Sequence, residues 1–249
     1  MTACIEVRDL HKKFGEHVVL DGITLTVERG TTFVVLGGSG SGKTVLMKHV
    51  IGLLKPDSGT VLVEGIEIAK LTGWELTEAR RMFGMVFQGA ALFDSMTVYD
   101  NVAFPLKERE RGISAAELRR RVVDKLKVVD LDEDVLGKYP AELSGGMRKR
   151  VALARAVVHD PKVVLYDEPT TGLDPITTAY VDDMILTAKK RLGVTSMVIS
   201  HDIASAFKVA DRLAVLYDGH IAAQGTPEEV RKSQHPFVQR YLSMWFEKQ

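Results

Sequence analysis

One glycine-rich stretch of the sequence has the composition of a phosphate-binding loop. It matches the phosphate-loop pattern in full and reads Gly37, Gly38, Ser39, Gly40, Ser41, Gly42, Lys43 and Thr44. Glycines let several backbone N–H groups turn toward one anion, and they let a phosphate chain approach without meeting a Cβ atom. We expect Lys43 to add a positive charge at the terminal phosphates and Thr44 to offer its hydroxyl to Mg²⁺. The stretch therefore predicts a site for a nucleoside triphosphate.

Two acids and a histidine follow other predicted strands. Asp167 and Glu168 come directly after the apolar run 163–166, and His201 follows the run 196–200. In open α/β sheets the carboxyl ends of the strands are where ligands bind, so these side chains should face the phosphate loop. We expect Asp167 to hold Mg²⁺, Glu168 to orient or deprotonate an attacking water, and His201 to contact the terminal phosphate. The alternatives are two ordinary loop acids and a surface histidine.

A second pair of glycines predicts another anion site. Ser144, Gly145 and Gly146 precede a predicted helix over residues 148–157. Ser144 is a good N-cap, so simple helix capping is the alternative, but adjacent glycines at a helix N-terminus also bind anions. One chain would then carry two phosphate-binding surfaces. The simplest explanation is that two copies share each nucleotide across a two-fold interface.

Two further side chains are weaker candidates from sequence alone. Gln88 ends the apolar run 85–87, where it could touch Mg²⁺ or water. Phe14 precedes the turn glycine Gly15, where its ring could stack on a nucleotide base or simply anchor the loop. Neither choice is decided by the residues themselves.

These residues need an α/β scaffold, and the sequence predicts one. Residues 32–36 are β-branched and apolar, which predicts a strand that enters the phosphate loop, and residues 45–51 predict a helix that leaves it. The N-terminal end of that helix would direct its positive dipole at the bound phosphate. Strands that alternate with helices later in the chain predict a parallel sheet. A glycine-rich surface turn would leave this agreement unexplained.

The chain is expected to form one domain with a helical insertion. An antiparallel β layer opens it, and the strand-bearing core covers about residues 1–88 and 161–225. About residues 89–160 are mainly helical and interrupt the core, and about residues 226–249 form a helical tail. The tail is expected to dock on the body, with docking on a partner as the alternative. The predicted fold class is therefore α/β, with a parallel sheet, an antiparallel layer and an inserted helical subdomain.

Local signals support two of the helices. Ser114 with Glu117, and Thr226 with Glu229, each have the spacing of a capping box. The helix after Ser114 also carries basic residues on its outer faces, among them 119–121. Such a face could meet RNA or lipid headgroups, but intervening acids favour an ordinary solvated helix face.

Composition limits the classes of function. The 249 residues contain 33 basic and 33 acidic side chains, so the charge signature of a nucleic-acid-binding protein is missing, and we expect no nucleic-acid partner. No signal peptide and no apolar run of 18 residues is found, so the chain is expected to fold in the cytosol and to reach a membrane only through a partner. Cys4 is the single cysteine, which excludes an internal disulfide.

Taken in order, the motifs resemble those of the nucleotide-binding subunit of ATP-binding-cassette (ABC) transporters, over essentially the whole chain. They are the phosphate loop, Gln88, LSGGM at 143–147, VVLYDEP at 163–169, TGLD at 171–174 and His201. The resemblance implies a RecA-like P-loop NTPase core, ATP as substrate, Mg²⁺ as cofactor and hydrolysis coupled to transport. It also implies a second copy of the chain as partner, and an integral membrane permease.

The same resemblance assigns roles to the nucleotide-binding residues. Phe14 stacks on adenine, in place of the more usual tyrosine, and Gln88 is the lid glutamine. The segment 144–146 is the signature that closes on ATP held by the opposite subunit. Thr171 lies at the nucleotide and Asp174 at the dimer contact.

The resemblance also assigns the hydrolytic residues. Glu168 is the general base and His201 senses the γ-phosphate, with Lys43 at the phosphates. A plain nucleotide kinase would explain neither His201 nor the second glycine pair. A soluble ABC ATPase acting on nucleic acid or the ribosome is an alternative, but the tandem cassettes, coiled coils or basic linkers of that class are not seen in the sequence.

Within the family, one segment looks like the ATPases of MCE-associated phospholipid transport, the Mla type. Residues 87–98 and 101–106 carry it, with Ala90 in place of the first residue of the glycine-alanine pair in the usual FQ-x-GALF sequence. This likeness implies phospholipid as cargo, an MCE-domain protein as further partner, and a peripheral position on the cytoplasmic face of the inner membrane. A transporter ATPase for amino acids, metals or drugs is the alternative.

Overall fold

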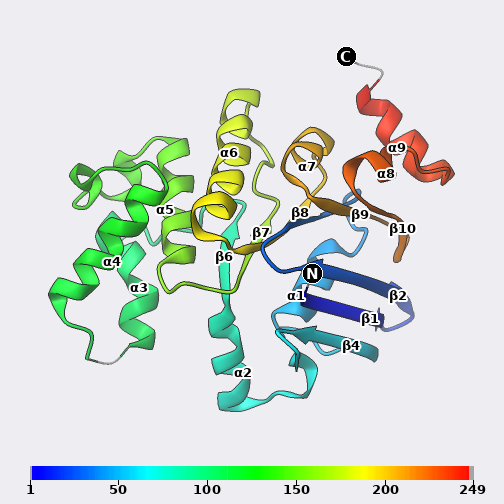
Figure 1. Cartoon of the computed structure of the whole chain (residues 1–249), viewed down its shortest axis with the longest axis horizontal. Helices are drawn as coiled ribbons and strands as arrows, with labels where there is room; N and C mark the ends of the chain where they lie inside the picture. The colour runs from blue at the N-terminus through cyan, green and yellow to red at the C-terminus, as the bar shows by residue number, and fades with distance from the viewer. Residues whose placement is uncertain (1, 111, 247–249) are drawn as a thin grey trace.

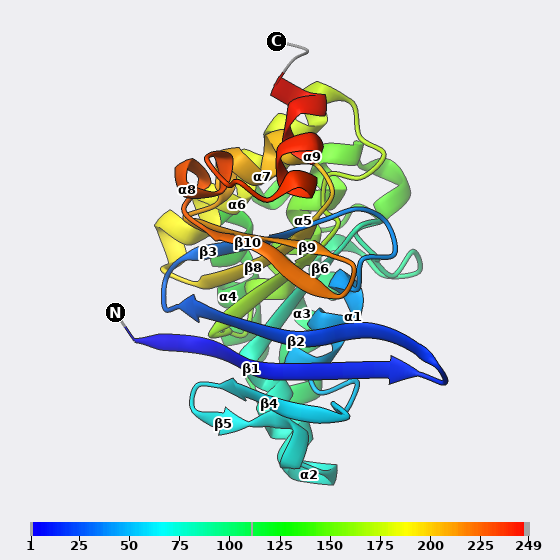
Figure 2. The same ribbon diagram turned by 90° about the vertical axis from the view of Figure 1, so that its right-hand side faces the viewer.

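The protein is built from two β-sheets with helices packed around them (Figure 1). The computed structural model describes residues 2–110 and 112–246, with side chains as far as residue 243. Figure 2 shows the layers: the larger sheet lies between helices α5–α7 on one side and strands β1 and β2 on the other. The α/β fold class predicted from the sequence is confirmed by this architecture.

The larger sheet carries the strands that lead to the predicted site. Its order is β10-β9-β3-β8-β7-β6, and its neighbouring strands are parallel except for the β9–β10 hairpin. The strands are β3 (Thr32–Leu36), β6 (Phe83–Phe87), β7 (Val163–Asp167), β8 (Thr195–Ser200), β9 (Arg212–Tyr217) and β10 (His220–Gly225). Since β3, β8 and β7 are adjacent, the loops that follow them must meet at one edge of the sheet.

The central strand β3 is buried on both faces, and this explains why its sequence is a continuous apolar run. Val34 and Leu36 pack into the apolar cluster under the helices α3–α7, whereas Phe33 and Val35 pack into the cluster shared with the smaller sheet and α1 (Lys43–Val50). Successive side chains of a strand point to opposite faces, so one strand contributes to two cores. The phosphate loop therefore starts from a rigid support.

The smaller sheet is antiparallel, as the alternating sequence of its strands predicts. Its order is β2-β1-β4-β5, with β1 (Ala3–Phe14), β2 (His17–Glu28), β4 (Ser58–Val63) and β5 (Ile66–Glu67). In the central register Glu6 lies opposite both Thr26 and Leu62. The chain then passes through α2 (Gly73–Ala79) and the short 3₁₀ helices η1 (Ile68–Lys70) and η2 (Arg80–Met82) before it enters β6.

The helical subdomain is formed by α3 (Val98–Arg109), α4 (Ala115–Val128) and α5 (Gly145–Val157), with the 3₁₀ helices η3 (Glu133–Val135) and η4 (Pro140–Glu142) between α4 and α5. It forms the group at the left of Figure 1. The chain leaves the core at the end of β6 and returns at β7, the strand beside it. The subdomain is therefore an insertion between two neighbouring strands.

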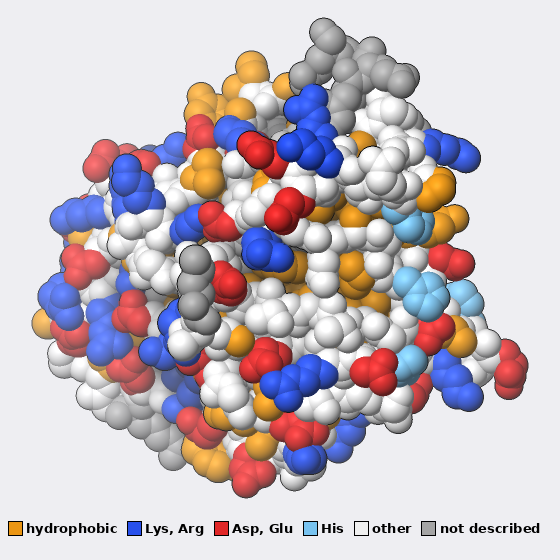
Figure 3. All heavy atoms as spheres, turned by 45° about the vertical axis from the view of Figure 1, so that its right-hand side comes forward, with side chains coloured by type: hydrophobic (Ala, Val, Ile, Leu, Met, Phe, Trp, Pro, Cys, Tyr) orange, Lys and Arg blue, Asp and Glu red, His pale blue; other side chains and the backbone are white. Residues whose placement is uncertain are grey.

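The capping box predicted at α4 is half formed. Ser114 Oγ accepts a hydrogen bond from the Glu117 backbone N–H at 3.2 Å. The carboxylate of Glu117 does not return to Ser114, because Arg120 donates two hydrogen bonds to it and Arg121 donates one. Charge-assisted bonds of this kind are stronger than a bond to a neutral N–H. Figure 3 likewise shows Lys and Arg interspersed with Asp and Glu over the face that it draws.

The remaining helices cover the face of the larger sheet opposite the smaller sheet and its edge at β9 and β10. They are α6 (Pro175–Leu192), α7 (Ile203–Val209), α8 (Pro227–Arg231) and α9 (Pro236–Phe246). The capping box predicted at Thr226 and Glu229 is confirmed at α8. In the described part of the chain, every helix is too short or too polar to cross a bilayer.

The C-terminal tail docks on the body, as predicted. Val238 and Leu242 of α9 are buried in the apolar cluster beneath the helices. Trp245 and Phe246 are further apolar residues of this tail, and their side chains lie outside the described part. The tail is thus a packed element of the fold as far as residue 243.

Candidate functional site

The phosphate loop is shaped by close contacts that only glycine allows. A Cβ on Gly37 would lie 2.5 Å from the carbonyl oxygen of Leu216, and a Cβ on Gly42 would lie 2.8 Å from a methyl group of Leu20. Gly42 also has a φ of 101°, in the left-handed region that favours glycine. These two positions set the turn from β3 into α1, and the first turn of the helix begins directly at Lys43.

Lys43 is held with its ammonium group inside the loop. It is 5% exposed, and its Nζ donates hydrogen bonds of 2.9 Å to the carbonyl oxygens of Gly37 and Gly38. The same Nζ lies 3.4 Å from Glu168 Oε1. A buried cation with bonds fixed on one side is oriented to meet an anion on the other. This geometry fits the role of a phosphate-binding lysine.

One unpaired atom in the loop also points to a ligand. The Ser41 hydroxyl is buried and has no hydrogen-bond partner among the described residues. A buried hydroxyl without a partner is costly, and a bound oxyanion would satisfy it. The neighbouring Thr44 lines the hollow above the loop. The loop therefore has the donors that a triphosphate requires, at the N-terminus of α1.

Glu168 is the centre of the polar contacts at the strand ends. Its Oε2 lies 2.7 Å from His201 Nδ1, and it accepts a 3.0 Å hydrogen bond from the Thr171 hydroxyl. The backbone N–H of His201 also donates to Oε2, at 3.3 Å. With Lys43 near its other oxygen, Glu168 joins the ends of β3, β7 and β8 in one network. These are the three strand ends that the sequence predicts to meet.

The neighbouring acid Asp167 lies in a different environment. It is the last residue of β7 and is half-buried. Burial, and then the negative charge of Glu168, raise the pKa of Asp167, while Lys48 and Lys43 act in the opposite direction. A carboxylate that is disfavoured in its charged form would be relieved by a cation. Asp167 and Thr44 therefore have suitable chemistry to hold Mg²⁺, which prefers oxygen ligands.

Most of the residues just described line a hollow of about 490 Å³, but Asp167 and Ser41 are not among its walls. Its walls are formed by Gly38, Ser39, Gly40, Lys43, Thr44, Glu168, Thr171, His201 and Tyr241. Tyr241 belongs to α9, and sequence reasoning missed it as a residue of this site. No local motif signals its role, because only the docking of the tail brings it there.

Other residues predicted at the nucleotide lie outside that hollow. Phe14 is 48% exposed near the β1–β2 turn, and the Lys12 ammonium lies 5.5 Å from its ring centre. Asp174 is the exposed N-cap of α6 and accepts bonds from the backbone N–H groups of Ile176 and Thr177. Neither the ring of Phe14 nor the carboxylate of Asp174 lines the hollow above the phosphate loop of the same chain.

Gln88 does not line the hollow either, and its backbone is held by a lysine of the helical subdomain. The Lys149 ammonium, on α5, donates hydrogen bonds to the carbonyl oxygens of Gln88 and Pro169. Pro169 follows Glu168 in the chain, so this buried lysine links the helical subdomain to the strand ends β6 and β7. The sequence analysis missed Lys149. The only signal was a charged residue at a position of α5 that faces the core.

The second predicted anion site lies on the helical subdomain. Ser144 is the N-cap of α5 and accepts a hydrogen bond from the Met147 N–H at 3.3 Å. The space beside Gly146 is open, and beside Gly145 the nearest atom is an Arg148 side-chain nitrogen at 3.9 Å. None of the three signature residues lines the hollow of the same chain. Their backbone is therefore accessible to a ligand from outside.

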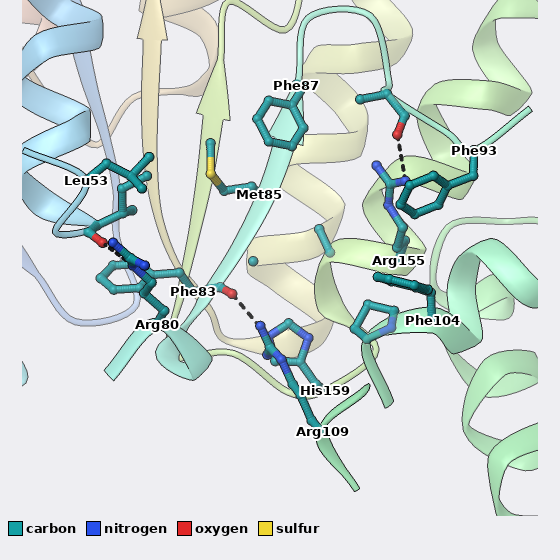
Figure 4. Close-up of a pocket in the computed structure, with 15 residues that line it drawn as sticks. Leu53, Arg80, Phe83, Met85, Phe87, Phe93, Phe104, Arg109, Arg155 and His159 are labelled. Atoms are coloured by element: carbon teal, nitrogen blue, oxygen red, sulfur yellow. Dashed lines mark hydrogen bonds between the residues drawn. The ribbon is translucent and has the colours of Figure 1, made fainter. Parts of the chain in front are cut away.

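An apolar groove of about 420 Å³ lies between the core and the helical subdomain (Figure 4). Leu53, Phe87 and Phe93 expose large parts of their side chains to it. Two of its cationic side chains are bonded to backbone carbonyl groups: Arg80 to Ile51 and Gly52, and Arg155 to Ala90 and Ala91. The buried Nη1 of a third, Arg109, has no hydrogen-bond partner among the described residues. The sequence analysis did not predict this groove, because its residues come from distant segments.

Relatives of known annotation match most of the chain. A probable ribonucleotide transport ATP-binding protein, mkl of Mycobacterium leprae, is 41% identical over 98% of this chain and 70% of its own length. The intermembrane phospholipid transport ATP-binding protein MlaF of Haemophilus influenzae is 39% identical over 96% of this chain and 89% of its own. The methionine import ATP-binding protein MetN 1 of Listeria innocua is 40% identical over 96% and 71%.

Solved structures agree with the family. The cbiO1 protein of Clostridium perfringens, part of the ABC transporter complex cbiONQ, matches with a TM-score of 0.87 at 31% identity, over 100% of this chain and 97% of its own. A dimeric post-hydrolysis state of the cassette MJ0796, with ADP and Pi bound, matches with a TM-score of 0.78 at 33% identity, over 90% and 98%. The ABC transporter family model matches residues 20–171. The chain therefore belongs to the ABC transporter family and is an ATP-hydrolysing subunit of such a transporter.

Proposed function

We propose that two copies of this chain bind two ATP molecules between them and use their hydrolysis to drive a membrane permease. The observation that carries this proposal is the separation of two half-sites. The hollow above the phosphate loop lacks the signature residues 144–146, which are open to solvent on the helical subdomain of the same chain. A second copy, turned by a two-fold axis, would bring its signature over the hollow of the first. The MJ0796 cassette is a dimer in its solved structure.

In this proposal each region of the chain has its own part. Residues 1–88 and 161–225 form the core that holds ATP, and residues 89–160 carry the signature to the partner. Phe14 stacks on the adenine of the bound nucleotide, and Asp174 contacts the second copy. The tail 226–249 completes the single domain.

Hydrolysis would depend on positioning and on charge stabilisation at the terminal phosphate. The amides of the phosphate loop and the ammonium group of Lys43 bind the phosphates. Glu168 orients and deprotonates the attacking water, and its bond to His201 keeps its carboxylate in place. Thr171 donates a hydrogen bond to the same carboxylate.

Three oxygen-bearing side chains would hold Mg²⁺. They are Thr44, Gln88 and Asp167, of which Asp167 already bears a raised pKa that a cation would relieve. The metal ion supplies neutralisation of the developing charge on the phosphate oxygens. Closure of the helical subdomain would bring Gln88 over the hollow, and Lys149 connects the backbone of Gln88 to Pro169 during that movement.

The groove in Figure 4 is the proposed contact for the permease. The groove lies where the helical insertion joins the core, beside the residues that follow Gln88. A permease segment bound in the groove would therefore move when the two copies of this chain close on ATP. Its lining favours an apolar, aromatic-accepting segment of the partner. The chain would then lie on the cytoplasmic face of the inner membrane, held there by the permease.

Phospholipid is the proposed cargo, with an MCE-domain protein as a further partner. The support is the segment 87–106 of the sequence together with the named relative MlaF, which matches over 89% of its own length. The relatives mkl and MetN 1 are named for other cargo. Purifying the tagged chain from membranes decides between them: co-purifying permease and MCE-domain proteins support phospholipid, and a periplasmic solute-binding protein would contradict it.

The catalytic part is tested with Glu168→Gln. The amide keeps the size of the side chain but is no base, so turnover should fall by roughly 100-fold or more, the usual scale for a positioned general base. The affinity for ATP should be kept. Turnover close to that of the natural chain would remove Glu168 from this role.

The shared site is tested by concentration. ATPase activity per chain should rise with chain concentration until the dimer is saturated, and Gly145→Asp should abolish it without changing ATP binding by the monomer. A monomer with full activity at high dilution would contradict the two-copy arrangement.

A further inference from the structure

The C-terminal helix α9 forms part of the wall of the triphosphate hollow. Tyr241 is the residue of α9 that lines the hollow, beside Glu168, Thr171 and His201. Its hydroxyl donates a hydrogen bond of 3.2 Å to the backbone carbonyl oxygen of His201, a residue 40 positions earlier in the chain. A tail that follows the core thus contacts the main chain of a residue assigned to hydrolysis.

The side chain of Tyr241 is held by packing on both sides. Its neighbours Val238 and Leu242 are buried in the apolar cluster of the core. Its ring stacks on that of Phe237, with centres 5.4 Å apart and planes 14° from parallel, and Phe237 stacks on Tyr217 at 3.7 Å and 17°. A side chain already ordered by such contacts loses little conformational freedom when its hydroxyl makes a bond. The hydroxyl is therefore a preorganised donor.

The residue it contacts has little other restraint on its side chain. The His201 ring is 52% exposed, and its Nδ1 lies 2.7 Å from Glu168 Oε2. A half-exposed ring keeps such a geometry only if the backbone that carries it is fixed. The backbone N–H of His201 is bonded to Glu168, and the carbonyl oxygen is bonded to Tyr241. The two bonds fix the peptide groups on both sides of the residue.

We propose that Tyr241 is a positioning residue for His201, and that the docked helix α9 is part of the hydrolytic apparatus. The hydrogen bond from Tyr241 sets the main chain of His201, and this places the His201 ring against Glu168. Burial, followed by the charges of Glu168 and Asp202, raises the pKa of Tyr241 to about 12, so the phenol stays protonated and remains a donor. The inference rests on the proposed roles of Glu168 and His201.

The test is Tyr241→Phe in the full chain, at a concentration where activity per chain no longer rises. The substitution removes the hydroxyl and keeps the ring, so the aromatic stack and the docking of α9 are preserved. We expect kcat to fall about three- to tenfold, the scale of one lost hydrogen bond, with KM for ATP unchanged. Tyr217→Phe is the matched control, because its hydroxyl makes no hydrogen bond among the described residues; kcat should be unchanged.

A double-mutant cycle separates positioning from a general loss of structure. In a His201→Ala background, Tyr241→Phe should have no further effect on kcat, because the side chain that it positions is gone. An unchanged kcat in Tyr241→Phe would overturn the proposal. Independent, multiplicative losses in the cycle, or a fall in ATP affinity together with the melting temperature, would overturn it as well. Glu168→Gln in the same assay tests the proposed function separately: if it lowers turnover and Tyr241→Phe does not, only the inference about α9 fails, and if Glu168→Gln leaves turnover unchanged, the proposed role of Glu168 fails.

Discussion

The hollow above the phosphate loop and the apolar groove beside it use charged side chains in opposite ways. In the hollow, Lys43, Glu168 and His201 are linked to one another across the ends of three strands. In the groove, Arg155 and His159 are bonded to backbone carbonyl groups of neighbouring segments. The first set can exchange its partners for a ligand. The second set cannot do so without opening the fold.

The charged groups of the hollow are therefore available for catalysis, whereas those of the groove stabilise the fold. Charges that neutralise each other at strand ends are available to a phosphate or a metal ion, and their loss should be felt in turnover. A cation that donates to buried carbonyl groups stabilises the loops that carry them, and removing it leaves those acceptors unsatisfied. Substitutions in the hollow should therefore reduce activity more than stability, and substitutions in the groove should do the reverse. Three experiments test this contrast.

The largest effect is expected for Lys43→Ala. It removes the ammonium group that meets the terminal phosphates, so turnover should fall on the order of 10²–10³-fold, the scale for one lost electrostatic contact to a transition state. The free energy of unfolding, measured in urea, should fall by about 1–2 kcal/mol, because only the Gly37 carbonyl loses a buried donor while the Gly38 carbonyl borders the hollow. If turnover of Lys43→Ala stayed within tenfold of the natural chain, the claim that the charged residues of the hollow are needed for activity would be contradicted.

Arg155→Met tests the groove. Arg155 is 9% exposed, and its guanidinium donates bonds of 2.7 and 2.9 Å to the carbonyl oxygens of Ala91 and Ala90. Methionine keeps the apolar stem but leaves both acceptors unpaired, so the free energy of unfolding should drop by about 2–4 kcal/mol. ATP affinity of the folded chain should stay within about threefold, since Arg155 does not line the hollow.

The control for that measurement is Arg119→Met. Its guanidinium forms an exposed pair with Glu133, so the same change of residue type should alter the free energy of unfolding by less than about 1 kcal/mol. If both substitutions lowered the free energy of unfolding equally, the hydrogen bonds from Arg155 to Ala90 and Ala91 would contribute no more to stability than an exposed ion pair.

The smallest effect is expected for His159→Gln, read as a function of pH. Burial, and then the charge of Arg109, lower the pKa of His159 from 6.5 to about 4, and its Nε2 lies 3.1 Å from the carbonyl oxygen of Phe83. Because the folded pKa is the lower one, protonation favours the unfolded chain. The stability provided by neutral His159 is complete above pH 6.5 and is lost as the pH falls toward 4.

Urea unfolding at pH 7.5, 6 and 5 measures this dependence. The natural chain should lose about 1–3 kcal/mol more than His159→Gln over that range. Glutamine retains an N–H donor for Phe83 and does not titrate, so parallel stability curves for the two proteins would contradict a depressed pKa in the groove.

The sequence predicts the parts of the molecule whose signals are local. The continuous apolar runs that became β3, β7 and β8 identify a buried parallel sheet, and their carboxyl ends gather Glu168 and His201 beside the phosphate loop as expected. The Asp-Gly pair at 218–219, a residue pair that favours tight hairpin turns, lies between β9 and β10. In each case one short segment carries the physical cause of its own structure.

Contacts between distant segments could not be predicted in this way. Tyr241 enters the hollow only because Val238 and Leu242 dock α9 on the core, and the groove forms only where β6, α3 and α5 meet. At α4, the expected reciprocal cap gave way to three hydrogen bonds from Arg120 and Arg121 to Glu117, since local spacing does not decide which partner a carboxylate binds. Local sequence patterns do not contain two kinds of information: how distant segments pack together, and which of several possible partners a side chain binds.

The double burial of β3 limits how this chain can diverge. Val34 faces the helices and Val35 faces the antiparallel sheet, so inserting or deleting a single residue in the strand would exchange the two sets of side chains. The phosphate loop would be displaced with them. Length variation among descendants of this sequence should therefore collect in surface turns such as the one between β4 and β5, while β3 keeps its length even as its individual side chains change.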